Sequence, residues 1–236
     1  PSPSHGPRRG VARPDMVVIH YTAMADAAAA IERLCDPVAE VSAHYVIARD
    51  GSVTALVAED RRAWHAGVAS WAGETDVNSR SIGIELDNPG LDGDTPVPFA
   101  AAQMAALERL LAAILARHAI PPARVVGHAC VAPGRKADPG PAFDWRRLAR
   151  SGLAVWLDPG AAARGVGPAA PAARFRGAAL GLGLGLEATG PWDASAGAAW
   201  SALAARFLPA HWRSARPSEG AIAHLERLAT AYPAVR

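Results

Sequence analysis

The chain has 236 residues, 50% hydrophobic and 19% charged, which is the composition of an ordinary globular protein with one large domain or one domain plus a small appendage. The formal net charge at pH 7 is only +2, so we expect no nucleic-acid partner. The two cysteines, Cys35 and Cys130, are too few for a disulfide framework. Apolar stretches are short and interrupted by glycine, so we expect no transmembrane segment.

The first part of the chain alternates between strand and helix patterns. Short β-branched runs predict strands at Met16–Tyr21, Ser81–Leu86 and residues 124–127. Asp50-Gly51, between two β-rich runs, predicts a hairpin over residues 43–58. Apolar spacing and stop signals predict helices at residues 25–34, 99–118 and 144–150. This interleaving predicts an α/β fold with a mixed central β-sheet flanked by helices.

Composition changes after this part. Residues 153–172 are rich in Ala, Gly and Pro, which is typical of a linker. Helical segments are predicted beyond it at residues 173–186, 194–210 and 218–231. The first of these contains "GLGLGL", a poor helix former because each interior glycine costs about 1 kcal/mol. The predicted organisation is an α/β domain over residues 1–152, a linker over 153–172 and a small C-terminal helical domain over 173–236.

Two of the eight histidines stand where predicted strands end. His20 ends the run "VVIH" and His128 follows "VVG", and strand ends in α/β proteins are where ligands bind. Together with Asp138 they would offer a metal two nitrogens and one oxygen. Such a set leaves a fourth tetrahedral position for water, as a catalytic zinc site requires. For each histidine alone, the alternative is a purely structural role.

Two further charged residues suggest chemistry. Lys136 is the only lysine, which indicates a site that needs a compact, titratable ammonium and not a planar guanidinium. Glu85 lies in the apolar strand "SIGIEL", where a buried carboxylate is costly without partners. We interpret Glu85 as a general base, with Asp87 as its nearest rival. The structural alternative is that Glu85 pairs with Arg80.

Five stretches then carry a resemblance: "MVVIHYT", "VSAHYVIARDGSV", "AWHAG", "NSRSIGIEL" and "GHACVAPGRKADPGP". Over about residues 17–150 the chain resembles the zinc-dependent N-acetylmuramoyl-L-alanine amidases, a family that includes anhydro-muropeptide amidases and peptidoglycan recognition proteins. The resemblance implies a Zn²⁺ cofactor held by His20, His128 and Asp138. It implies catalytic roles for Glu85, as the catalytic carboxylate, and for Lys136, which would stabilise the transition state. It also implies a substrate groove formed by His65, Trp64, Asn78 and His44.

The implied reaction is zinc-dependent hydrolysis of the amide bond between N-acetylmuramic acid, or its 1,6-anhydro form, and L-alanine. Residues 1–152 would be the catalytic domain, and the C-terminal domain resembles a degenerate peptidoglycan-binding domain. One alternative is a peptidoglycan-binding receptor without activity. The other is a zinc peptidase acting on the stem peptide, which the lack of an H-E-x-x-H motif disfavours.

Three smaller expectations complete the sequence prediction. Cys130 stands where relatives often have the second residue of a Ser-Asp type pair; we interpret it as buried and inert, the alternative being a thiolate contact at the metal. We expect a monomer whose partner is peptidoglycan or an anhydro-muropeptide. No signal peptide is visible, which favours the cytoplasm, with the periplasm or outer membrane as alternatives if an upstream signal was removed.

Overall fold

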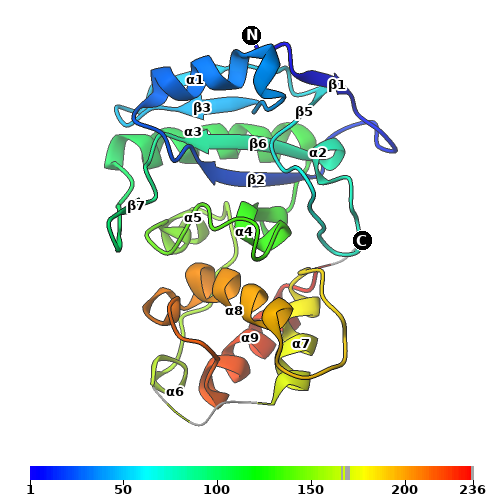
Figure 1. Ribbon diagram of the computed structural model, residues 1–236, viewed down its shortest axis with the longest axis vertical. Helices are drawn as coiled ribbons and strands as arrows, with labels where there is room; N and C mark the ends of the chain where they lie inside the picture. The colour runs from blue at the N-terminus through cyan, green and yellow to red at the C-terminus, as the bar shows by residue number, and fades with distance from the viewer. Residues whose placement is uncertain (166, 168–170, 235–236) are drawn as a thin grey trace.

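A five-stranded mixed sheet forms the centre of the fold (Figure 1). The computed structural model describes residues 1–165, 167 and 171–234. The sheet strands, in the spatial order β4-β3-β6-β2-β9, are β2 (Met16–Tyr21), β3 (Tyr45–Ile47), β4 (Val53–Ala55), β6 (Ser81–Leu86) and β9 (Val125–Gly127). Only the β3–β4 pair is antiparallel within this sheet; the other neighbours run parallel. The predicted mixed sheet is confirmed.

Helices and two small strand pairs surround this sheet. The helices are α1 (Ala27–Cys35), α2 (Val77–Arg80), α3 (Ala101–His118), α4 (His128–Val131) and α5 (Trp145–Arg150). The strand pairs are β1 (His5–Pro7) with β5 (Arg61–Ala63), and β7 (Leu91–Asp92) with β8 (Thr95–Pro96). Single 3₁₀ turns lie at Pro37–Ala39, Pro122–Arg124 and Pro209–His211. The sequence missed the short elements because two to four residues do not reveal a period.

The predicted hairpin forms the outer edge of the sheet. Strands β3 and β4 pair antiparallel, with Ile47 opposite Val53. Gly51 in the turn has a φ of +88°, where a side chain is strained. A Cβ on Gly51 would also lie 2.7 Å from the carbonyl oxygen of Ala102 at the start of α3. The turn therefore needs glycine both for its conformation and for its contact with the helix.

The two faces of the sheet are packed differently. Val17 and Ile19 of β2 join the apolar core that α3 and α5 complete. Met16 and Val18 point the other way, into a smaller core with Val126 and Val77. Because side chains alternate along a strand, the next residue in this second set is His20. The face of the sheet opposite α3 therefore carries polar residues at the ends of its strands.

The C-terminal part is a helical bundle with its own core. Its helices are α6 (Ala161–Arg164), α7 (Ala172–Gly181), α8 (Ala194–Phe207) and α9 (Glu219–Ala231). Phe175, Trp200, Leu203 and Leu225 lie at its centre. Asp193 and Ser218 cap α8 and α9 by accepting hydrogen bonds from main-chain N–H groups, as N-cap residues do. The fold class, including a small C-terminal helical domain, is confirmed.

The first C-terminal helix is shorter than predicted. It ends at Gly181, and residues 182–186 of the expected helix are not helical. Gly183 has a φ of +91°, and Leu184 forms a bridge with Trp71 of the sheet region. The "GLGLGL" stretch therefore connects the C-terminal helices to the sheet region. Its glycines permit both the turn at Gly183 and the close approach of its backbone to Trp71.

Part of the predicted linker is built into the structure. Leu153 and Ala154 join the core beside α3, and α6 lies within the predicted segment. Residues 166 and 168–170 of that segment lie outside the described residues, so the domain boundaries stay a prediction. None of the helices in the described part of the chain combines the length and hydropathy that crossing a bilayer requires.

A buried arginine links the two regions. Arg206 of α8 donates a hydrogen bond from Nη2 to the carbonyl oxygen of Val125 in β9, at 3.0 Å. Its guanidinium carbon lies 4.4 Å from the centre of the Trp145 ring. Figure 1 shows α8 facing α4 across the boundary between the regions. The helical region is therefore attached directly behind the strand that leads to His128.

Candidate active site

The candidate site lies where three parallel strands end. In the β2–β6 ladder His20 stands opposite Glu85, and in the β2–β9 ladder Ile19 stands opposite Gly127. His128 follows Gly127 and begins α4. Because paired residues of neighbouring strands point to the same face, His20 and Glu85 share one face, and the chain turns into α4 beside them. The sheet thus brings His20 and His128 together, although they are 108 positions apart in the sequence.

Asp138 is delivered by the loop after α4. Gly127 makes room for this loop, because a Cβ there would lie 2.7 Å from the Cδ atom of Pro139. The main-chain N–H of Ala129 donates to the carbonyl oxygen of Asp138 at 2.8 Å. The loop therefore folds back on the start of α4 and places the Asp138 carboxylate next to His128.

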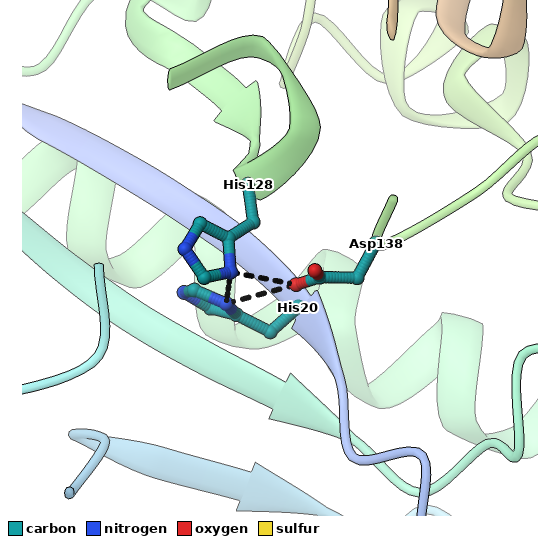
Figure 2. Close-up of side chains that lie close together, drawn as sticks. All are labelled: His20, His128 and Asp138. Atoms are coloured by element: carbon teal, nitrogen blue, oxygen red, sulfur yellow. Dashed lines mark hydrogen bonds and ion pairs between the residues drawn. The ribbon is translucent and has the colours of Figure 1, made fainter. Parts of the chain in front are cut away.

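His20, His128 and Asp138 converge on one point (Figure 2). The two Nδ1 atoms are 2.9 Å apart, and each lies 3.0 Å from Oδ2 of Asp138. All three residues are buried, with exposures of 1%, 2% and 5%. The sequence predicted that these three residues bind one metal ion, and in the structure their ligand atoms lie close enough together to do so.

The chemistry of this donor set fits a metal ion. Three lone-pair atoms this close repel one another unless a cation lies between them. His128 Nε2 lies 3.1 Å from the carbonyl oxygen of Ala66, which can only accept, so Nε2 carries the hydrogen and Nδ1 has the free lone pair. Metal-ligating histidines are commonly oriented by such a bond from the other ring nitrogen.

Burial governs the protonation of the site. It lowers the pKa of His20 to about 4, with His128 adding to the effect, and lowers the pKa of His65 well below its usual 6.5. Burial disfavours the ionised form of Asp138, but the imidazoles of His128 and His20 outweigh it and hold the pKa of Asp138 well below its usual range. Near neutral pH the site therefore offers a neutral His20 imidazole and the Asp138 carboxylate, the forms that bind metals.

Glu85 lines the same cleft as the three residues. Its Oε2 atom is buried and has no hydrogen-bond partner among the described residues. Burial, followed by the charge of Asp138, raises the pKa of Glu85 well above its usual value. Its rival Asp87 forms an ion pair with Arg49 at 3.1 Å and is not among the described residues that line the cleft. Arg80 pairs with Asp15 and Glu74. The structure thus places Glu85, and not Asp87, in the cleft beside the three clustered residues.

Lys136 stands at the rim of the cleft. The cleft has a volume of about 370 Å³ and is lined by Lys136 together with Glu85 and the three clustered residues. Lys136 also lines a second cavity of about 380 Å³, which extends to Trp212 near the end of α8. Its ammonium is the one lysine charge beside the cluster.

The four predicted groove residues divide into two pairs. Trp64 and His65 line the cleft. Asn78 and His44 are not among the described residues that line the cleft, so their role in substrate binding stays a prediction. Asn78 Oδ1 accepts hydrogen bonds from the N–H groups of residues 65 and 66, at 3.1 and 2.8 Å. His44 is fully buried, and its Nδ1 atom accepts from the N–H of Gly83 at 3.0 Å. Asn78 and His44 therefore each bind main-chain N–H groups of neighbouring segments.

Sequence reasoning missed three residues beside the site. Tyr21 and Arg135 line the cleft, and Arg135 Nε donates to the carbonyl oxygen of Val68 at 3.0 Å. Ser81 lies behind the cleft, in contact with His65. Tyr21 and Arg135 are adjacent in sequence to His20 and Lys136, and Ser81 begins the strand that carries Glu85; these positions were the available signals. Cys130 is buried in the apolar core of the helical region and is not part of the metal-ligand group found among the described residues.

The sequence matches the family described as N-acetylmuramoyl-L-alanine amidase (Amidase_2) over residues 10–141. The chain belongs to this family. AmiD of Escherichia coli, an N-acetylmuramoyl-L-alanine amidase, is 43% identical over 154 residues, which are 61% of this chain and 55% of AmiD. This match therefore spans only about half of the length of AmiD.

Two solved structures extend the likeness to the helical region. The complex of E. coli AmiD with the substrate anhydro-N-acetylmuramic acid-L-Ala-D-γ-Glu-L-Lys superimposes with a TM-score of 0.80 at 32% identity, covering 96% of this chain and 93% of that one. AmpDH3 of Pseudomonas aeruginosa, in complex with anhydromuramic pentapeptide, gives 0.80 at 34% identity, with 94% and 93% covered. The amidase fold thus includes the C-terminal helices.

Proposed function

We propose that this protein is a zinc amidase that hydrolyses the bond between N-acetylmuramic acid, or its 1,6-anhydro form, and L-alanine in muropeptides. The observation that carries the proposal is the convergence of His20, His128 and Asp138 in one cleft with Glu85, whose Oε2 atom has no hydrogen-bond partner in the described part of the chain. The solved relatives with anhydro-muramoyl peptide ligands support the substrate class.

The metal would be held by Nδ1 of both histidines and by the Asp138 carboxylate. When bound, a zinc ion supplies Lewis-acid chemistry, which lowers the pKa of a water molecule toward about 7 and polarises the scissile carbonyl. The Ala66 carbonyl keeps His128 in the tautomer that binds. The low pKa of His20 leaves its ring unprotonated at neutral pH.

Glu85 would act as the general base and then as the general acid. Its Oε2 atom accepts the proton of the attacking water and returns it to the nitrogen of the leaving L-alanine. The raised pKa of Glu85 suits this double role, because a base whose pKa lies closer to the working pH also returns the proton more readily.

Lys136 would stabilise the negative charge that develops on the carbonyl oxygen. Lys136 lines the cleft together with the three clustered residues and Glu85, so its ammonium is close to the reacting carbonyl. An ammonium is a compact point charge that can approach a single oxygen, whereas a guanidinium is larger and planar. Trp64 and Tyr21, which also line the cleft, would border the sugar and peptide.

Mass spectrometry of the products tests this function. The purified zinc-loaded protein is incubated with an anhydro-muropeptide and, separately, with intact peptidoglycan, each with and without a strong chelator. We expect sugar without peptide and a stem peptide with a free alanine amine, both abolished by the chelator. Cleavage within the stem peptide would instead identify a peptidase. Binding without any turnover, in protein shown to hold zinc, would identify a receptor.

A further inference from the structure

His65 occupies an unusual position between a candidate ligand and a serine. Its Nδ1 atom lies 3.0 Å from Nε2 of His20, and its Nε2 atom lies 3.0 Å from Oγ of Ser81. Both nitrogens of the ring are therefore engaged by side chains. The His20 nitrogen in this contact is the one that points away from the metal-ligand cluster.

The donor and acceptor in each of these hydrogen bonds can be assigned by starting from Val77, the last acceptor in the series. The Ser81 hydroxyl lies 2.6 Å from the carbonyl oxygen of Val77, which can only accept, so the hydroxyl hydrogen points there. Ser81 Oγ must then accept from Nε2–H of His65. The Nδ1 atom of His65 is left with a lone pair, so it accepts from Nε2–H of His20. His20 Nδ1 consequently has its lone pair directed toward His128 and Asp138.

The structure also holds the His65 ring and its backbone in place. Gly83 lies under the ring, and a Cβ on it would be 2.4 Å from Cγ of His65. Asn78 Oδ1 binds the N–H groups of both His65 and Ala66. Ala66 in turn presents the carbonyl oxygen that lies 3.1 Å from Nε2 of His128. Two consecutive residues of one loop thus contact the outer nitrogens of both histidine ligands.

We propose that Ser81 and His65 form a hydrogen-bond relay that fixes the tautomer and orientation of His20 for metal binding. His65 is then a positioning residue that acts through His20. Its place in the cleft wall follows from this task and does not require a contact with the substrate. The proposal rests on the proposed metal centre, but the tautomer of His20 can be measured without any metal.

Nitrogen-15 NMR of histidine-labelled, zinc-free protein at neutral pH is the direct test. Chemical shifts distinguish a ring nitrogen that carries hydrogen from one that does not. We expect His20 to carry its hydrogen on Nε2 in the wild type and to lose this preference in His65→Leu, which keeps bulk but removes the acceptor. A wild-type His20 with its hydrogen on Nδ1 would overturn the relay, whether or not the protein binds zinc.

Zinc affinity, measured by competition with a chromophoric chelator, is the second readout. We expect His65→Leu and Ser81→Ala to weaken zinc binding by about 10- to 100-fold, as losses of such outer partners do. His65→Asn should recover much of the affinity, because its amide oxygen can accept near the position of Nδ1. Unchanged affinity in both His65→Leu and Ser81→Ala would refute the relay. If the wild type itself binds no zinc, the metal centre fails, and the NMR result still decides the relay.

Ser79→Ala is the matched control. Ser79 is a fully buried serine two residues from Ser81, and its hydroxyl donates to Oδ2 of Asp76 at 2.8 Å, away from any imidazole. We expect this variant to keep the wild-type zinc affinity and His20 tautomer. A loss equal to that of Ser81→Ala would show that any change in this turn loosens the site, and would count against a specific relay.

Discussion

The sheet region and the helical C-terminal region both bury polar side chains, but they direct them differently. In the sheet region His20, His128 and Asp138 point at one another beside Oε2 of Glu85, for which the described residues offer no hydrogen-bond partner. In the helical region, buried Arg176 donates to the carbonyl oxygens of residues 187 and 191 at 2.9 and 2.8 Å. A buried side chain that donates to main-chain carbonyl oxygens holds a loop in place. Several buried side chains that direct their lone-pair atoms at one point instead indicate the site of a ligand.

The comparisons with relatives show the same contrast. The family match ends at residue 141, before the helical region, whereas the AmiD structure covers 96% of the chain. Chemistry requires particular residues at particular positions. Packing requires mainly the right volume and apolar pattern, so sequences diverge there while the fold persists. If this interpretation is right, substitutions in the two regions should affect different measurements.

Glu85→Gln should have the largest effect among the single changes that leave the metal ligands intact. It keeps the shape of the side chain but removes the basic oxygen, so we expect turnover to fall roughly 10²-fold or more with zinc still bound. Steady-state kinetics and metal content measure the two quantities. Asp87→Asn is the control, since Asp87 pairs with Arg49 outside the cleft. Near-normal turnover of Glu85→Gln would return Glu85 to a structural role.

Lys136→Arg should lose most of kcat although it preserves the charge. Removing one electrostatic donor from a developing oxyanion costs about 10²–10³ in rate, and the planar guanidinium should not reach the same point. The measurement is kcat for Lys136→Arg and Lys136→Ala, with zinc content and circular dichroism as checks. Wild-type turnover in the arginine variant would remove Lys136 from the catalytic set.

The buried His44 predicts a pH dependence of stability. Burial lowers the pKa of His44 to about 4 from 6.5 in the unfolded chain, so the unfolded state takes up a proton first as the pH falls. Stability is therefore lost between pH 6.5 and about 4, with His44 accounting for on the order of 3 kcal/mol. Urea unfolding of wild-type protein and His44→Asn in chelator-containing buffers measures this. Equal slopes in the two proteins would contradict the assignment.

Arg206→Ala should change stability and leave catalysis nearly intact. It removes the bond to the Val125 carbonyl and the contact with Trp145, so we expect a loss of about 2–4 kcal/mol in the free energy of unfolding. Calorimetry and kcat at 25 °C separate the effects. The exposed Arg213, which also pairs across the two regions with Asp94, is the control, and its loss should cost less than about 1 kcal/mol. A collapse of kcat without destabilisation would make the helical region part of the catalytic machinery.

The sheet region was more accessible to sequence reasoning than the helical region. Strand patterns such as "MVVIHY" and the Asp50-Gly51 turn carry local signals, and strand ends place His20 and Glu85 at one edge. The "GLGLGL" stretch was predicted as part of a helix because its contact with Trp71 depends on the tertiary fold. The roles of His44 and Asn78 could not be predicted either, since a histidine or asparagine looks the same in sequence whether it faces a cleft or a buried N–H group.

The zinc content of wild-type protein and His20→Ala, purified identically and quantified by mass spectrometry of the metal, tests the central claim most directly. We predict one zinc per wild-type chain and a near-complete loss of zinc in His20→Ala, with loss of turnover in both His20→Ala and chelator-treated wild type. Stoichiometric zinc in His20→Ala, or full turnover of wild-type protein freed of metal, would contradict a catalytic zinc centre built on His20, His128 and Asp138.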